Sequence, residues 1–374
     1  MWTVLAALAC GLSGSGLLAA PAWTATSAPD DAAWACLASS ADGRKLAGAA
    51  RAGPIYLSTN AGLSWIDSGA PNLQWRSIAS SADGTKLVAA SYFGPIYVST
   101  NSGGSWSNGT APSLAWASVC SSANGTKCAA VVYGGPVYTS TDSGYTWASH
   151  IPSDYWNAIA SSTDGVRLVA SVANGPICVS TNSGTNWRQT SAPLTNWASV
   201  CSSANGAVLA GTGGGMPAFL SATSGTNWGP TSSPLGPWDT IASSADGKSL
   251  VMGAYGGAIV TSKDFGSTWA SNNAPSGYWT SVVCSTNADT LFAAMYIGPI
   301  FSTRPTLALG VAPAGTNVLL SWPWTSAGFS LQQKVDAGAS NWNSLSVSPS
   351  LTNWQNQALL PVTNPVTFYR LALP

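Results

Sequence analysis

Few residues in this chain are suited to catalysis, and they restrict the reactions open to it. The sequence of 374 residues has thirteen acidic residues, all of them aspartates, so glutamate is absent, and His150 is the single histidine. A lone histidine supplies neither a nucleophile–base pair nor a set of metal ligands. The sequence also lacks Asp-x-Asp-x-Asp calcium loops and glycine-rich phosphate loops. It therefore predicts no cofactor and no metal.

Aspartates remain a route to acid–base catalysis. A glycosidase needs two carboxyl groups about 5–10 Å apart. Asp30, Asp31, Asp154 and Asp239 lie close to the first residues of the repeats described below, so we expect them near one end of the molecule. No spacing marks two of them as a pair. A divergent glycoside hydrolase that uses these aspartates is the alternative hypothesis, and a non-catalytic binding or scaffold protein is the main one.

Charge is scarce and balanced along the chain. Only 7% of the residues are charged, with thirteen basic and thirteen acidic side chains, whereas about 25% is usual. The sequence therefore offers no basic surface for nucleic acid. A hydrophobic content of 45% is enough for a substantial core. We expect a folded protein that does not bind nucleic acid.

The N-terminal segment is apolar. Residues 1–22 are rich in Leu, Ala and Gly and end in Ala20-Pro-Ala22, which is typical of a secretory signal with a small-residue cleavage site before Trp23. Glycines interrupt the run, and its length is marginal for a membrane-spanning helix. We expect a secreted monomer whose mature chain has no membrane span.

A period of 40 or 41 residues organises most of the chain. The repeats begin at Trp34, Trp75, Trp116, Trp156, Trp197, Trp238 and Trp279. Each contains a strand that begins at the tryptophan, a turn that is usually Asp-Gly or Asn-Gly, an apolar strand, a glycine-rich turn that is usually Gly-Pro, and a third strand. With a short fourth strand, this pattern predicts an all-β fold, a seven-bladed β-propeller of four-stranded blades over residues 23–304.

A second motif follows the third strand in six repeats. Examples are Ser58-Thr-Asn-Ala-Gly-Leu-Ser-Trp65 and Ser140-Thr-Asp-Ser-Gly-Tyr-Thr-Trp147. These segments resemble Asp-box (BNR) repeats, which occur in sialidases, sortilin-like receptors and photosystem II assembly factors. The resemblance covers about three quarters of the chain and implies a β-propeller. The Asp or Asn side chain is suited to cap backbone amides and the glycine to adopt a positive φ, so we expect the boxes to be structural.

The resemblance to sialidases implies requirements that this sequence does not meet. A sialidase-like mechanism needs an arginine cluster and a tyrosine nucleophile activated by glutamate. Glutamate is absent, and only Arg51 and Arg76 are placed to share one mouth of the propeller. This departure favours a binding protein over a sialidase.

Both ends of the repeat region carry further information. The seventh repeat stops at residues 300–303 without a box, and residues 23–29 are similar to residues 187–193, which form a fourth strand elsewhere. We therefore expect residues 23–29 to complete the last blade. Residues 305–374 change pattern and predict a small β-sandwich, loosely similar to fibronectin-like modules, with a role in adhesion, spacing or export.

Aromatic side chains recur before the turn between the second and third strands. Aromatic rings on a loop face can stack on sugars or hold a peptide, although they can equally pack between blades. The repeat tryptophans are expected to be mainly buried. The candidate residues for binding a carbohydrate or a protein are Arg51, Arg76, Tyr92, Tyr133, Tyr255, Tyr296 and Asp239.

Six cysteines remain after residue 22. At the fourth position after the repeat tryptophan, cysteine alternates mainly with alanine, as in Ala79 and Cys120, so it behaves as a small apolar residue. Cys120 and Cys128 lie on the two strands of a predicted hairpin, where a disulfide is possible. Packing as free thiols is the alternative for this pair.

Overall fold

The structure is a computed structural model that describes residues 23–303, 309–323, 330–334, 341–352, 355–361 and 367–372. The expected signal, residues 1–22, lies outside them. The chain divides into two compact units, residues 22–304 and a second unit that contains residues 305–374. All regular elements of the described residues are β-strands, so the protein is all-β.

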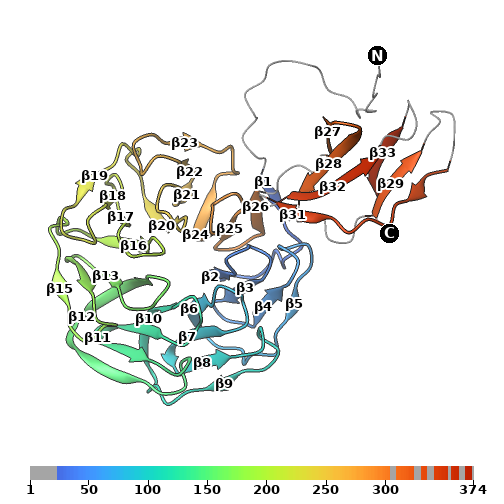
Figure 1. Cartoon of the computed structure of the whole chain (residues 1–374). Helices are drawn as coiled ribbons and strands as arrows, with labels where there is room; N and C mark the ends of the chain where they lie inside the picture. The colour runs from blue at the N-terminus through green and yellow to red at the C-terminus, as the bar shows by residue number, and fades with distance from the viewer. Residues whose placement is uncertain are drawn as a thin grey trace. The chain divides into compact units, whose positions relative to one another are not determined.

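Except for the last, each repeat forms four antiparallel strand segments in sequence order. In the second repeat these are β6 (Trp75–Ser80), β7 (Leu87–Gly94), β8 (Ile96–Ser99) and β9 (Ser107–Asn108). The same order recurs in β2 (Trp34–Ser39), β3 (Leu46–Ala50), β4 (Ile55–Ser58) and β5 (Ile66–Asp67); in β16 (Trp197–Ser202), β17 (Leu209–Gly213), β18 (Phe219–Ser221) and β19 (Gly229–Pro230); and in β20 (Trp238–Ser243), β21 (Leu250–Gly257), β22 (Ile259–Ser262) and β23 (Ala270–Ser271). Figure 1 shows these sheets arranged around a common centre.

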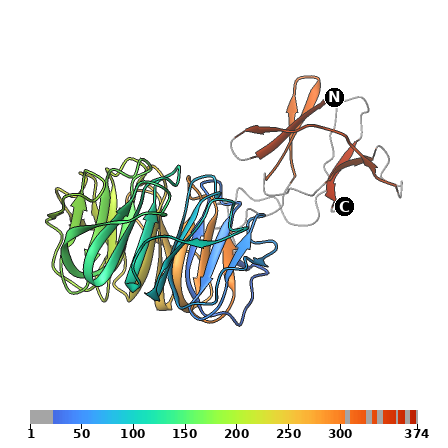
Figure 2. The same cartoon turned by 90° about the horizontal axis from the view of Figure 1, so that it is seen from below.

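Longer strands join the third and fourth repeats. β10 (Leu114–Ser121) pairs with β11 (Cys128–Ser140), which supplies the second and third strands of the third repeat. β12 (Ala148–Ser161) then ends the third repeat and begins the fourth, which continues through β13 (Leu168–Val172), β14 (Ile177–Ser180) and β15 (Arg188–Gln189). In Figure 2 the sheets of residues 23–303 are seen from the side, with their strands running between two ends of the ring.

The last sheet is built from both ends of the repeat region. It contains β24 (Gly277–Cys284), β25 (Leu291–Met295) and β26 (Ile300–Thr303), and β1 (Trp23–Ala25) pairs with β26 as its outer strand. The register places Trp23 opposite Thr303 and Ala25 opposite Phe301. The strand that completes this sheet therefore comes from the region where the sequence led us to expect it, although it spans three residues rather than seven.

The repeat tryptophans lie in the cores between neighbouring sheets. All seven are at most 5% exposed. Trp116, for example, packs with Ile96 and Val98 of the preceding repeat, and its Nε1 donates a hydrogen bond to the carbonyl oxygen of Gly94 at 3.0 Å. Trp75 and Trp279 make the equivalent bond to Gly53 and Gly257. These tryptophans therefore hold adjacent sheets together rather than binding a ligand.

A closed ring of backbone hydrogen bonds links the repeats at the end where the first strands finish. Seven residues occupy the same position in the Asp-Gly or Asn-Gly turns, and each amide donates to the carbonyl of the next repeat at 2.7–2.8 Å: Ala41, Ala82, Ala123, Thr163, Ala204, Ala245 and Thr286, whose amide returns to Ala41. We call this the serine end, because serines flank the ring residues in every repeat. Since these bonds use only the backbone, small side chains suffice there.

The box turns are held by side chains that bond to their own backbone. In the first box the hydroxyl of Ser58 accepts a bond from the amide of Gly62 at 2.8 Å, and Oδ1 of Asn60 accepts one from the amide of Ser64 at 2.9 Å. In another box, Oδ1 of Asp264 accepts from the amide of Thr268 at 2.8 Å. Asn and Asp therefore perform the same structural task in these turns.

The possible disulfide between Cys120 and Cys128 does not form. The register pairs Cys120 with Ala129 and Ser121 with Cys128, so the two cysteines are offset by one residue. An offset of one places side chains on opposite faces of a sheet, and the two residues indeed belong to different cores. Both are buried free thiols, and burial raises the pKa of the Cys128 thiol to about 12.

The C-terminal unit contains two sheets. β27 (Gly310–Ala314), β28 (Asn317–Pro323), β32 (Gln355–Pro361) and β31 (Ser350–Thr352) form one, and β30 (Asn343–Ser344), β29 (Ser330–Lys334) and β33 (Phe368–Ala372) form the other. Val318, Leu320 and Trp322 of the first sheet share a core with Leu331 of the second. The two sheets are therefore held together by one small apolar core.

Candidate functional site

Most of the expected binding residues project from the end of the ring opposite the serine end. In each repeat the second strand runs back toward the repeat tryptophan, as shown by Ser91 pairing with Trp75, and the turn to the third strand follows at once. Tyr92 begins that turn, and its amide donates to the carbonyl of Gln74 at 2.7 Å. We call this face the aromatic rim, defined by Tyr92, Phe93, Tyr133, Tyr155, Tyr255, Tyr278 and Tyr296.

The aromatic side chains of the rim lie in pairs. Tyr133 contacts Tyr155 with ring centroids 5.3 Å apart, and Tyr255 contacts Tyr278 at 4.8 Å. In both cases the second tyrosine comes from the first strand of the next repeat. These side chains are about half-exposed, with Tyr133 at 50%. Packing within the fold thus covers only part of each ring.

Two further stacks use different partners. The ring of Tyr92 lies 4.3 Å from that of Phe93, which follows it in the same turn. The guanidinium carbon of Arg51 lies 5.1 Å from the ring centroid of Tyr296, in cation–π geometry. Arg51 is half-buried, and its Nε is buried without a hydrogen-bond partner among the described residues.

Three of the few charged groups act on one another near the rim. Arg76 and Asp239 both directly follow a repeat tryptophan, at a β-bulge in the first strand. Both side chains are exposed, but protein atoms crowd the carboxyl group of Asp239, and this desolvation raises its pKa above the usual value. The positive charges of Arg76 and Arg51 oppose this effect. The three groups carry a net charge of +1 when Asp239 is ionised.

The serine end has a different character. A cavity of about 220 Å³ lies there, lined by residues such as Ser39, Ser80, Ser121 and Ala41 together with their equivalents around the ring. The hydroxyl of Ser39 donates to the neighbouring carbonyl of Ser40 at 2.9 Å, and Ser80 repeats the arrangement. The lining is therefore neutral and its hydroxyl protons are already used.

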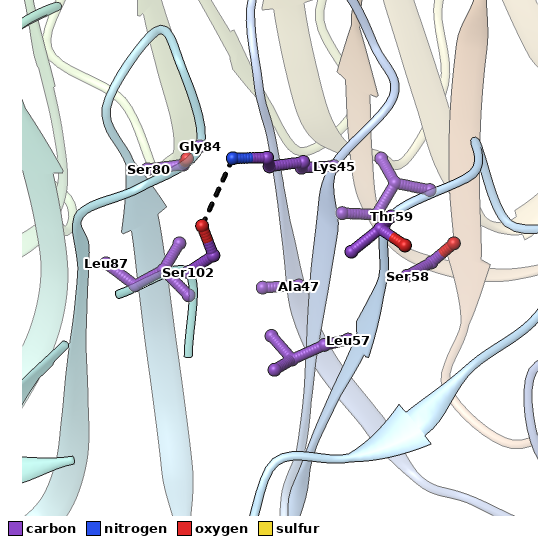
Figure 3. A pocket seen from close by; sticks show the side chains of 10 residues that line it. Lys45, Ala47, Leu57, Ser58, Thr59, Ser80, Gly84, Leu87 and Ser102 are labelled. Atoms are coloured by element: carbon purple, nitrogen blue, oxygen red, sulfur yellow. Dashed lines mark hydrogen bonds between the residues drawn. The ribbon is translucent and has the colours of Figure 1, made fainter. Parts of the chain in front are cut away.

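A smaller cavity between the first and second repeats is structural. Figure 3 shows it bordered by Ala47, Leu57 and Leu87, with Nζ of Lys45 donating to the hydroxyl of Ser102 at 3.1 Å. Its volume of about 10 Å³ leaves room for one water molecule at most. Lys86 bonds to Ser143 in the same way at the next junction. These lysines fasten neighbouring repeats and do not form a ligand site.

The described residues offer little for catalysis. They contain no group of three or more His, Cys, Asp and Glu side chains that could hold a metal. Nε2 of His150 lies 2.7 Å from the hydroxyl of Thr139 in an outer strand, and Oδ1 of Asp154 accepts a bond from the amide of Tyr155 at 2.8 Å. The charges that act on Asp239 come from arginines rather than from a second carboxylate. Within the same residues, no helix is long and apolar enough to cross a membrane.

Sequence reasoning placed some rim residues and missed others. Arg51, Tyr92, Tyr133, Tyr255 and Tyr296 occupy equivalent turn positions, as the repeat alignment implied. Sequence reasoning missed Phe93, which directly follows Tyr92. It also missed Tyr155 and Tyr278, each of which directly precedes a repeat tryptophan. It also missed exposed aliphatic side chains in the same loops, namely Leu194, Leu235 and Ile297. Phe93 and Ile297 share one repeat position, Tyr155 and Tyr278 a second, and Leu194 and Leu235 a third. Alignment of these three positions was the signal that could have found them.

Comparison with known proteins identifies the fold of the repeat region. No family model matches the sequence, and no curated protein matches it. Among solved structures, YCF48 bound to D1 peptide is similar with a TM-score of 0.60 and 16% identity, covering 76% of this chain and 97% of that one. YCF48 from Cyanidioschyzon merolae is similar with a TM-score of 0.62 and 14% identity, covering 76% and 99%. These structures are β-propellers, so the likeness establishes a β-propeller fold for this chain.

Proposed function

We propose that this chain is a secreted, non-catalytic binding protein that holds a protein partner on its aromatic rim. In this proposal the repeat region is a seven-bladed propeller of the Asp-box type, and residues 305–374 form a β-sandwich-like module. The closed ring of seven backbone bonds supports the number of blades. The turns that Ser58, Asn60 and Asp264 hold support the Asp-box assignment.

The observation that carries the proposed function is the exposure of paired aromatic side chains on one face. Large apolar side chains that remain exposed together on a soluble protein mark interaction surfaces. Tyrosines and arginines contribute strongly to such surfaces because they present large contact areas at a small entropic cost. Binding of a D1 peptide by a structure of the same fold is compatible with a protein partner here.

Secretion and the monomeric state remain part of the proposal. Residues 1–22 support secretion through their composition. A carbohydrate is the second kind of ligand that an aromatic face can accept. The hydrolase alternative needs a pair of carboxyl groups, and none of the contacts around Asp239 or Asp154 favours it.

The test is a parallel selection with two ligand classes. The mature chain is presented to a displayed library of random 12-residue peptides and to a glycan array. Enriched peptides that bind the native chain and the Leu63→Ala variant, but not Tyr133→Ala or Tyr255→Ala, support the proposal. Leu63 is a suitable control because it is exposed in a box turn away from the rim. Binding to glycans alone would reassign the rim to carbohydrate, and no binding in either assay would contradict a binding role.

A further inference from the structure

In one turn of the rim, a bulky residue occupies a position whose backbone conformation disfavours it. In five repeats the turn after the second strand passes through the left-handed region at the same position. The residues there are Phe93, Gly134, Asn174, Gly215 and Gly256, with φ of 55°, 74°, 54°, 76° and 78°. Glycine and asparagine adopt this conformation readily, whereas a bulky aromatic residue is strained in it. The turn geometry therefore does not explain Phe93.

Packing does not explain Phe93 either. Its side chain is 69% exposed and belongs to none of the apolar cores, and its one ring contact is with Tyr92. Strain in an exposed residue that contributes little to the core is a pointer to function. The role of Phe93 therefore lies in what its ring adds to the rim.

The Phe93 ring completes an aromatic pair that the neighbouring repeat does not supply. In the third and sixth repeats the turn residue is glycine, and Tyr155 and Tyr278 of the following repeats provide the second ring. In the second repeat the residue opposite Tyr92 is Ala115, which has no ring. Phe93 fills this role from within its own turn. The same pair of rings is thus built in two ways.

Positive charge lies beside this pair. Arg76 follows Trp75, which pairs with Ser91, and Ser91 precedes Phe93 by two residues. Because the strands are antiparallel, Arg76 and Phe93 are offset by three residues, about 10 Å along the strand direction, a span that one short peptide segment can cover. Arg76 is exposed, and among the described residues no hydrogen bond occupies its guanidinium. Asp239 is its electrostatic neighbour, and Arg51 acts on the same carboxyl group, so the three groups retain a net positive charge. This charge is complementary to a carboxylate on a partner.

We propose that Phe93 anchors the partner and that Arg76 binds a carboxylate next to the apolar residue that Phe93 contacts. The partner is thus a protein segment with an acidic side chain between large apolar residues. This inference rests on the proposed function of the rim. Aromatic residues and arginines dominate the energetic centres of protein interfaces, and a guanidinium binds a carboxylate through two parallel hydrogen bonds.

The test uses two defined peptides and the full mature chain. Fluorescein-labelled, end-blocked Gly-Leu-Phe-Asp-Phe-Leu-Gly carries the acidic side chain, and the same peptide with Asn in place of Asp is its neutral match. Fluorescence anisotropy gives the affinities, and thermal unfolding is measured on the same samples. The native chain is expected to prefer the acidic peptide about tenfold, which corresponds to about 1.4 kcal/mol.

The Phe93→Gly variant separates binding from stability. This variant is expected to bind the acidic peptide about 30-fold more weakly, the loss typical of an interface anchor. Its unfolding midpoint should stay unchanged or rise, because glycine relieves the backbone strain of the turn. Asn174→Gly is the matched control, since it changes the same turn position of another repeat. It should leave the affinity unchanged.

The charge is tested separately. Arg76→Gln should bind the two peptides equally well while keeping the native affinity for the neutral one. A lower midpoint of Phe93→Gly with unchanged affinity would overturn the anchor role, and equal affinities of the native chain for both peptides would overturn the carboxylate site. If neither peptide binds but library peptides still depend on Tyr133, the inference fails while the proposed function stands.

Discussion

The two ends of the ring differ in the groups that make their contacts, backbone at one end and side chains at the other. At the serine end every repeat contributes a small residue, and the bonds that close the ring join backbone to backbone. At the aromatic rim the equivalent position holds arginine, tyrosine, alanine or glycine, and the contacts join side chains. The sequence is repeated where the fold needs it, and it varies where side chains are left partly uncovered.

This difference separates the buried structural aromatic residues from those that we propose to bind a partner. The repeat tryptophans are present in all seven repeats and are buried, whereas the rim tyrosines occur in some repeats and are about half-exposed. A residue that every repeat needs for packing is expected to recur in every repeat. Variation between otherwise similar repeats is therefore a guide to binding residues in this fold.

The largest expected effect is the loss of a repeat tryptophan. Trp116→Ala should lower the free energy of unfolding by about 3–5 kcal/mol, because it opens a cavity in a packed core and removes the bond to the carbonyl of Gly94. Urea denaturation followed by circular dichroism measures the change. Tyr133→Ala, the matched change at the rim, should cost less than about 1 kcal/mol. Equal losses for the two variants would remove the distinction between the ends.

Interrupting the backbone ring should have the next largest effect. Thr286→Pro removes the amide that closes the ring onto Ala41 and should lower the free energy of unfolding by about 1–3 kcal/mol. Thr286→Ala keeps the amide and gives the residue found at this position in most other repeats. It removes only the second bond to Ala41, which the Thr286 hydroxyl donates, so its loss should be smaller than that of the proline variant. A neutral proline variant would show that closure of the ring does not depend on this bond.

At the rim, removal of a charge is expected to be stabilising. The pKa of Asp239 is raised by desolvation, so its ionised form is disfavoured in the folded protein above the unfolded pKa of about 3.9. Asp239→Asn should therefore raise the unfolding midpoint at pH 7, with no difference from the native protein near pH 3. Thermal scans at the two pH values check this. A lower midpoint at pH 7 would mean that attraction to Arg76 and Arg51 outweighs desolvation.

The smallest expected effect lies in the turns of the serine end. Bonds from the hydroxyl of Ser81 and the amide of Thr85 lower the pKa of Asp83 to about 2. Its contribution to stability is therefore present above about pH 4 and is lost as the pH falls toward 2. Asp83→Asn should be nearly neutral at pH 7, because Asn124 accepts the equivalent bonds in the next repeat.

An acid titration of unfolding distinguishes the Asp83→Asn variant from the native protein. The variant should lose less stability than the native chain between pH 4 and 2. The difference should be small, because Asp83 is exposed and solvent screens its charge. A large loss of stability in the variant at pH 7 would contradict the equivalence of Asp and Asn in these turns.

Sequence reasoning worked where the signal was local and repeated. The spacing of the tryptophans and the turn residues predicted β-strands in units of about 41 residues, and the β-propeller fold is confirmed. It left Cys120 and Cys128 undecided between a disulfide and free thiols, because a shift of one residue in register changes the face of the sheet. It also missed Tyr155 and Tyr278, since their pairing depends on which residues of two repeats meet. The ring of backbone bonds could not be predicted, because it requires only that the residues at this position be small.

The pairing of β1 with β26 has a consequence for how the protein is made. Thr24 and Ser302, which are bonded across these strands, are 278 residues apart. During synthesis β1 emerges before all of the repeats and β26 only at the end of the seventh, and contacts of such long separation form slowly. An unpaired strand edge is prone to aggregation until it is covered. A growing chain must therefore carry an open edge until all seven repeats have been made, and its solubility depends on how soon the last repeat is completed.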